Sequence, residues 1–233
     1  MRSFSSLLLL VLVFAVSPSF AAEANQLSAR EKADGWKLLF DGKSLQGWRG
    51  YKTPAVGTGW KVQDGALVLN AAKTGDLVTT AAYADFELIF EWKIAEGGNS
   101  GVFYRAGLGD SGASRSAPEY QVLDNEKAKD NKLGNHLAGA LYDLGNEVPR
   151  NLPKPVGQWN QGRVIVKGWQ VEHWLNGQKV ITADLASPAG KTLIAASKFK
   201  DWPTFAAHSQ GHIALQDHGD VVSYRNIKLR DLK

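Results

Sequence analysis

The chain has 233 residues, no cysteine and a formal net charge of +4. The absence of cysteine excludes disulfides, thiolate zinc sites and a cysteine nucleophile, so the hydrophobic interior must stabilise the fold. The net charge is small and the Lys and Arg residues are scattered, which argues against nucleic-acid binding.

Residues 1–22 have the composition of an export signal. Arg2 supplies positive charge, Leu7–Val16 is apolar, and Ala21 and Ala22 provide a small-residue cleavage site. The apolar segment is about ten residues, shorter than the roughly 20 needed to cross a bilayer, and no later segment is apolar enough to span. We therefore predict export to the periplasm or the extracellular space, with no membrane association after cleavage. A retained membrane anchor is the alternative.

The rest of the chain predicts a lead-in segment, residues 23–34, followed by one domain over residues 35–233. The lead-in is polar and forms a short helix or no fixed structure. No linker, repeat or low-complexity tract interrupts the domain. Roughly 210 mature residues are enough to bury a core as a single all-β domain.

Short β-type runs, rich in Val, Ile, Phe, Tyr and Trp, recur between Gly, Asn and Asp residues. Two dipeptides, Asp64-Gly65 and Asn176-Gly177, suit type I′ hairpin turns between such runs. No helical period of twelve or more residues stands out, so the pattern predicts two antiparallel sheets packed as a sandwich or jelly roll. The expected strands are Trp36–Phe40, Trp60–Gln63, Ala66–Leu69, Asp76–Thr79, Phe86–Ile94, Ser100–Tyr104, Glu119–Leu123, Arg163–Lys167, Gln170–Leu175, Lys179–Ala183, His212–Gln216 and Val222–Arg230.

Two segments, Gly107–Ala117 and Asn125–Leu152, are long and polar and do not have the pattern of strands. Loops of this length in a compact domain are usually functional or mobile. Because they flank the run Glu119–Leu123, we expect them to cover a site on that strand.

Two predicted strands carry polar faces. Alternation places Glu119 and Gln121 on one side of their strand, and a Glu and a Gln there are unfavourable to bury without partners. In the C-terminal strand the same period groups Gln216 with His218. An imidazole exchanges a proton near neutral pH and a Gln amide bridges hydroxyl groups, so the two faces together suit a polyhydroxylated ligand. The alternatives are a solvated outer face for Glu119 and a strand-end cap for His218.

Other candidates are less distinctive. His173 shares a face with core residues and is either catalytic or a satisfied core histidine, whereas His136 and Tyr142 lie in the long loop as lid or surface residues. Arg105 follows a strand and could pair with a carboxylate or orient a carbonyl oxygen. Asp124 and Trp202 are further candidates for substrate contacts, because Trp stacks on the apolar faces of sugars.

No cofactor is required by the sequence, although a divalent cation is possible. No Gly-x-Ser-x-Gly elbow or phosphate-binding loop is present. Oxygen donors of the type that calcium binds occur without EF-hand spacing, and three histidines could hold a transition metal only if folding gathers them. These donors are Asp124, Asn125, Asp130, Asn131 and Asp143, and the histidines are His136, His173 and His218.

The chain resembles the secreted bacterial 3-keto-disaccharide hydrolase family, also called the 3-keto-glucoside lyase and hydratase domain. The matching segments follow one another in order over nearly all of the mature chain. They are Gly35–Trp48, Trp60–Leu67, Phe86–Trp92, Asn99–Arg105, Glu119–Asp124, Glu172–Gly177 and Gly211–Ile227.

The resemblance implies a concanavalin A-like jelly roll and cleavage of glycosides whose glucose unit carries a ketone at C3. Such a ketone acidifies the C2 proton, so a base can remove it and expel the C1 substituent, after which water adds to the enone. This route needs a base, an electrophile at the developing enolate oxygen and an acid at the leaving group.

On this interpretation His218 or Glu119 is the base, and Arg105 or a bound cation faces the enolate. His173 and His136 are second choices for the acid, while Gln121 and Gln216 hold hydroxyl groups. The substrate is a small molecule or oligosaccharide, made by an upstream sugar 3-dehydrogenase.

Two other functions remain open from the sequence. The first is a lectin-like carbohydrate-binding module without catalysis, with Trp48, Trp92, Trp169 or Trp202 on its surface. The second is an ordinary endoglucanase, which needs two carboxylates about 5 to 5.5 Å apart for a retaining mechanism. Glu119 is the acid that the pattern assigns to the polar face, so this alternative has the least support.

Overall fold

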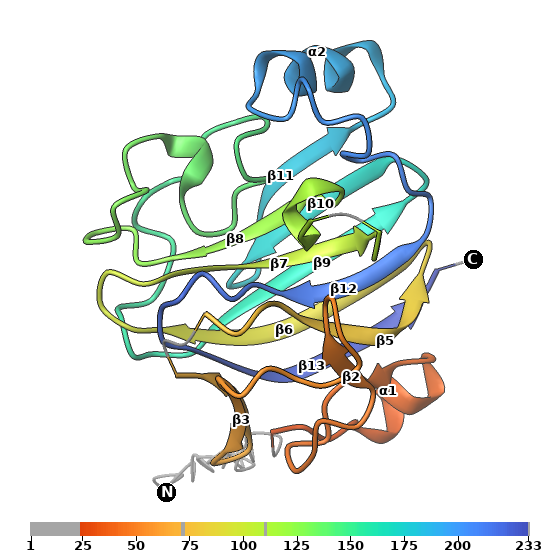
Figure 1. Cartoon of the computed structure of the whole chain (residues 1–233), viewed down its shortest axis with the longest axis vertical. Helices are drawn as coiled ribbons and strands as arrows, with labels where there is room; N and C mark the ends of the chain where they lie inside the picture. The colour runs from red at the N-terminus through yellow and green to blue at the C-terminus, as the bar shows by residue number, and fades with distance from the viewer. Residues whose placement is uncertain (1–23, 71–72, 110, 233) are drawn as a thin grey trace, which may run out of the picture.

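The computed structural model describes residues 24–70, 73–109 and 111–232. The predicted export signal lies outside the described residues. Two antiparallel sheets make up most of the fold, one in front of the other in Figure 1. None of the helices in the described part of the chain has the length and apolar character needed to cross a membrane.

The larger sheet has eight strands in the order β11-β10-β9-β6-β13-β4-β3, with β1 paired to β13. Its hairpin turns are those that the sequence predicts: Asp64 and Gly65, and Asn176 and Gly177, all have positive φ, as type I′ turns require. The strands are β1 (Lys37–Leu38), β3 (Trp60–Gln63), β4 (Ala66–Leu69), β6 (Phe86–Ile94), β9 (Asn160–Lys167), β10 (Gln170–Leu175), β11 (Gln178–Asp184) and β13 (Val222–Asp231).

The smaller sheet has five strands in the order β2-β5-β12-β7-β8. It brings together segments from the start, the middle and the end of the chain, because β12 pairs with both β5 and β7. The strands are β2 (Trp48–Gly50), β5 (Leu77–Tyr83), β7 (Asn99–Ala106), β8 (Glu119–Leu123) and β12 (Gly211–Leu215). Of these, β2 is too short to show a strand period in the sequence.

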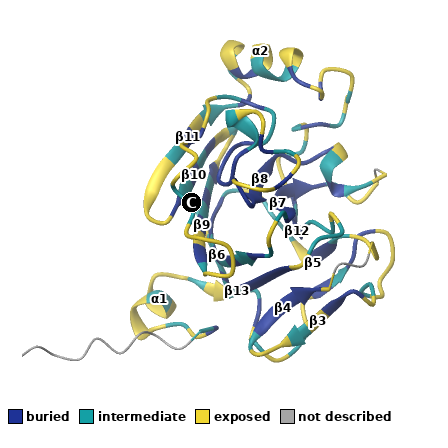
Figure 2. Cartoon of the chain, turned by 90° about the vertical axis from the view of Figure 1, so that its left-hand side faces the viewer, coloured by how far each residue is buried: buried dark blue, intermediate teal, exposed yellow. Residues whose placement is uncertain are grey.

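The hydrophobic core lies between the sheets (Figure 2). Phe90 of β6 and Tyr120 of β8 meet across it, edge to face, with ring centroids 5.1 Å apart. Alternation then directs the neighbours of Tyr120, which are Glu119 and Gln121, to the opposite face of the smaller sheet. The core therefore fixes the orientation of the polar side chains on β8.

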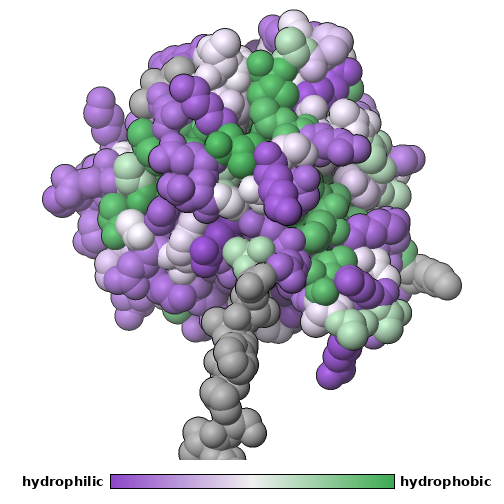
Figure 3. Space-filling view, turned by 90° about the horizontal axis from the view of Figure 1, so that it is seen from below, coloured by the Kyte–Doolittle hydropathy of each residue, from purple (hydrophilic) through white to green (hydrophobic). Residues whose placement is uncertain are grey.

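Short helices lie outside the sheets. The lead-in contains α1 (Ala29–Ala33), which Ser28 and Glu31 cap reciprocally. Two single-turn helices, η1 (Ala113–Arg115) and η2 (Gly134–His136), lie in the two long loops. The nine-residue α2 (Pro188–Ala196) begins with Ser187 as N-cap and Pro188 in its first turn, and it lies at the top of Figure 1. The opposite end of the molecule, seen in Figure 3, exposes a mixture of hydrophilic and hydrophobic residues.

Candidate active site

A cavity of about 190 Å³ lies on the outer face of the smaller sheet. Its floor comes from β7, β8 and the segment after β12, where the Gln216 N–H donates to Gly101 O at 2.9 Å. The two long loops and the segment after α2 supply the walls. The lining residues are Asn99, Ser114, Ala117, Glu119, Gln121, Asp130, Tyr142, Lys198, Phe199, Trp202, Gln216 and His218.

Glu119 is a buried carboxyl group in the floor of this cavity, with 7% of its surface exposed. Its pKa is raised to about 8, chiefly because burial disfavours the charged form; the Lys198 ammonium opposes the rise, and the carboxylates of Asp76 and Asp130 add to it. Gly101 leaves the space that the side chain occupies, because a Cβ at that position would lie 2.0 Å from Glu119 Oε1. A carboxyl group with this pKa can take or give a proton near neutral pH.

Two glutamines in the floor present amide groups without protein partners. Among the described residues, neither amide atom of Gln121 has a hydrogen-bond partner, and Gln216 Oε1 also lacks one. Gln121 is completely buried. Since buried polar groups are nearly always hydrogen-bonded, these amides suit a ligand with several hydroxyl groups.

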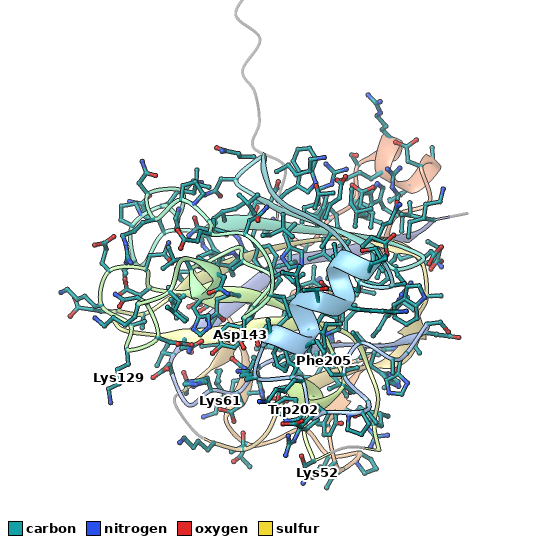
Figure 4. All side chains as sticks on the ribbon, turned by 90° about the horizontal axis from the view of Figure 1, so that it is seen from above. Lys52, Lys61, Lys129, Asp143, Trp202 and Phe205 are labelled. Carbon is teal, nitrogen blue, oxygen red and sulfur yellow. The ribbon has the colours of Figure 1, made fainter. Side chains whose placement is uncertain are left out.

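The walls carry charge and aromatic surface. The Tyr142 hydroxyl donates to Asp130 Oδ2 at 2.8 Å, and the Lys198 ammonium lies 4.0 Å from the Tyr142 ring centroid. Trp202 lies under the Arg115 guanidinium, at 4.1 Å. In the view of Figure 4, Asp143 and Trp202 lie beside α2. His218 is at the exposed rim, 3.4 Å from Asp220 Oδ2 through its Nδ1.

Comparison with known proteins identifies the family. The model of the 3-keto-alpha-glucoside-1,2-lyase-like domain matches residues 35–230. The chain belongs to this family. The relationship that the sequence motifs suggest, to enzymes acting on 3-keto sugars, is confirmed.

Individual relatives agree with membership of the lyase-like family. A Bacteroides thetaiotaomicron protein named 3-keto-disaccharide hydrolase is 37% identical over 91% of this chain and 83% of its own length. A crystal structure from Parabacteroides distasonis, provisionally named a glycosyl hydrolase, has a TM-score of 0.83 and 32% identity over 91% of this chain and all of that one. A carbohydrate-binding module from Bacillus subtilis shares the fold, with a TM-score of 0.51 and 15% identity over 79% of this chain and 96% of the module. The predicted jelly-roll sandwich is confirmed.

Most of the site residues predicted from the sequence line the cavity on the smaller sheet. Glu119 and Gln121 come from β8, and Gln216 and His218 from the segment after β12, so the two polar faces converge as expected. Tyr142 and Trp202 also line it. The chemical roles of these residues stay predictions.

Arg105 does not line the cavity, so it cannot face the enolate; of its two expected roles the structure shows the ion pair with a carboxylate, that of Asp85. A bulge between β7 and β12 interrupts the alternation there, and Arg105 adopts a φ of 56°. Its guanidinium donates to Ala84 O, Gly168 O and Asp85 Oδ1. The residue therefore ties the end of β7 to the turns before β6 and after β9, away from the site.

His173 and Asp124 also lie elsewhere. His173 is completely buried on the inner face of β10, between the Tyr104 hydroxyl and Gly139 O, and burial lowers its pKa to about 4. This is the core histidine of the alternative interpretation. Asp124 accepts the backbone N–H groups of Gly97, Glu126 and Lys127 and so stabilises a turn.

His136 lies behind the cavity wall, bonded to Asp130 and Asp143, and is not itself a lining residue. In the described part of the chain no three His, Asp or Glu side chains are arranged to hold a metal ion. The candidate metal ligands of the long loop are instead engaged with each other or with backbone groups.

The sequence interpretation missed several lining residues: Asn99, Ser114, Lys198 and Phe199, and Asp130 as a wall residue. Lys198 and Phe199 follow α2, in a segment without a strand or helix period long enough to place it. The available signal was the length of the loops Gly107–Ala117 and Asn125–Leu152, which indicated a cover for the site and which contain Ser114 and Asp130.

Proposed function

We propose that this protein is an exported enzyme that cleaves 3-keto-glucosides or 3-keto-disaccharides by C2 deprotonation, elimination and hydration. Its family and the name of its curated relative support the substrate class. The observation that carries the proposal is the buried carboxyl of Glu119, whose pKa is raised to about 8, beside two unpartnered Gln amides. Export rests on the composition of residues 1–22 alone.

Glu119 acts as the base in this proposal. The C3 ketone withdraws electrons from C2, so the carboxylate removes the C2 proton while the C1–O bond breaks and a C1=C2 double bond forms. Water then adds its oxygen to C1, and Glu119 returns the proton to C2. The net reaction is hydrolysis, and it requires one carboxylate in place of the pair that an ordinary glycosidase uses.

Lys198 takes the place at the enolate that the sequence interpretation gave to Arg105. Lys198 lines the same cavity as Glu119 and lowers the pKa of that carboxyl, which supports placing its ammonium where negative charge develops. His218 at the rim protonates the leaving oxygen and later takes a proton from the water that adds to C1. With His218 at the rim, the keto sugar lies inside the cavity and the aglycone points toward solvent.

The remaining groups bind the sugar. Gln121 and Gln216 hydrogen-bond its hydroxyl groups, since each amide has unused donors or acceptors. Trp202 offers a flat apolar surface for stacking. A cavity of about 190 Å³ is smaller than the roughly 300 to 1,000 Å³ typical for drug-sized ligands, and therefore suits a single sugar ring.

We also propose that the reaction needs no cofactor, and that an upstream sugar 3-dehydrogenase supplies the keto sugar. The test is incubation of the purified protein with a 3-keto-glucoside, with and without a chelator, followed by product analysis. We expect free 3-keto-glucose in both tubes and no product from the unoxidised glucoside. Binding of unmodified glycans without product would instead indicate the lectin-like module, and hydrolysis of the unoxidised glucan would indicate the endoglucanase.

A further inference from the structure

A hydrogen-bonded network behind the cavity wall centres on His136. Its Nδ1 lies 2.7 Å from Asp130 Oδ1, and its Nε2 lies 3.1 Å from Asp143 Oδ1. The imidazole thus bridges two carboxyl groups, and only 12% of its side chain is exposed.

Each of these carboxyl groups also accepts a hydrogen bond from a residue that lines the cavity. The second oxygen of Asp130 accepts from the Tyr142 hydroxyl at 2.8 Å, and the second oxygen of Asp143 accepts from the Lys198 backbone N–H at 2.9 Å. Tyr142 and Lys198 are both lining residues, and they touch each other through the Lys198 ammonium and the Tyr142 ring. The network therefore joins the long loop to the segment after α2, so that these two walls of the site hold each other in place.

We infer that His136 is a positioning residue, which clamps Tyr142 and Lys198 over the cavity and so sets the affinity of the enzyme for its sugar. The inference rests on the proposed function for its kinetic consequences. His136 itself does not touch the substrate, since it lies behind the lining residues. Loss of the clamp releases the Tyr142 ring, which weakens substrate binding and raises KM. It also displaces the Lys198 ammonium from the enolate, which lowers kcat.

The Tyr142 ring also packs against the imidazole. The two rings are tilted, with centroids 4.4 Å apart. This contact and the hydrogen bond to Asp130 hold Tyr142 from two sides.

An Asp143→Asn variant separates positioning from a general structural role. The Asn oxygen still accepts the Lys198 N–H, and its amide group donates to Nε2 of His136, whose Nδ1 donates to Asp130. Both connections of the network are kept, so we expect the KM of Asp143→Asn to stay close to that of wild type.

The deciding kinetic comparison is between His136→Gln and His208→Gln. His208 is another half-buried histidine, next to Gly107 and outside the network, so it is a matched control. In His136→Gln we expect KM to rise about tenfold or more, the size expected for one hydrogen bond to a charged group, and kcat to fall, with both unchanged in His208→Gln. An unchanged KM in His136→Gln, or a wild-type KM that responds to a chelator, would overturn the inference.

A second readout needs no substrate. Lys198 and Lys200 are exposed in the clamped segment, so trypsin acting on the folded protein reports release of that segment. We expect faster cleavage there in His136→Gln, and wild-type rates in His208→Gln and Asp143→Asn. Equal rates in His136→Gln and wild type would refute the clamp even if the protein proved inactive on 3-keto sugars, whereas inactivity with faster cleavage would count against the proposed function alone.

Discussion

Glu119 combines two properties that a general base for carbon acids requires. It is buried in a polar cavity, and its pKa is raised to about 8, chiefly by burial. Because the basic form is the carboxylate, the fraction of active enzyme increases as pH rises through that value. We expect kcat/KM of the free enzyme to rise from about pH 6 to about pH 9 and then level off, as measured on a 3-keto-glucoside.

Replacing Glu119 by Gln removes the base but keeps the size and shape of the side chain. We expect turnover to fall by about 10² or more, the usual effect of losing a proton-transfer group, and the remaining activity to lose the alkaline rise. Glu126→Gln, an exposed neighbour in the adjoining loop, is the matched control. Undiminished activity in Glu119→Gln would show that another residue is the base. His218→Ala would then be the next variant to measure.

The raised pKa of Glu119 also makes the free energy of unfolding depend on pH. The ordinary pKa of a Glu carboxyl is 4.5, so the unfolded state releases this proton at a lower pH than the folded state does. The stability associated with the neutral carboxyl is present below pH 4.5 and is lost between pH 4.5 and 8. We expect Glu119→Gln to be more stable than wild type at pH 8, by on the order of a few kcal/mol, and about equal at pH 4, as measured by urea unfolding. A difference that does not change with pH would contradict the burial of a titrating carboxyl.

At the level of elements, β7 and β8 create the floor of the site. Gly101 of β7 leaves room for the Glu119 carboxyl of β8, since an added Cβ would lie 2.0 Å from Oε1 and 2.7 Å from Cδ. Gly101→Ala should therefore turn the carboxyl away and lower kcat/KM by about 10², the scale of a displacement of about 1 Å.

A matched control exists for that variant. Gly109 has no atom within 4 Å of an added Cβ, so Gly109→Ala should keep wild-type kinetics. Full activity in Gly101→Ala would show that the carboxyl need not occupy its present position.

Strand elements were the most predictable part of the fold. Runs such as Trp60–Gln63, Phe86–Ile94 and Glu119–Leu123 agree with the observed β3, β6 and β8, because a half-buried strand shows its period directly. The sequence did not reveal the bulge beside Arg105, so it left two roles open for that side chain. It gave no indication of α2, whose nine residues are too few for a distinct helical pattern.

For the molecule as a whole, the core between the sheets positions the site. Phe90 of the larger sheet packs on Tyr120 of the smaller one, and Tyr120 lies between Glu119 and Gln121 in the sequence. We expect Phe90→Ala to lower the free energy of unfolding by about 3 to 5 kcal/mol, as measured by urea denaturation. Leu133→Ala, at an exposed position, should change it by less than about 0.5 kcal/mol. A small loss in Phe90→Ala would mean that the sheets are held together mainly by other contacts.

The sequence by itself determined the strands, the two-sheet architecture, the family and the polar faces of β8 and of the segment after β12. These follow from local periodicity and from ordered motifs, which each stretch of chain carries alone. Only the tertiary structure showed that Lys198 lines the site and that Arg105 does not. It also showed that His173 is a core residue and that His136 connects two walls of the cavity. Such contacts connect residues far apart in the chain, and their partners depend on how bulges and loops pack, which no period in a single segment encodes.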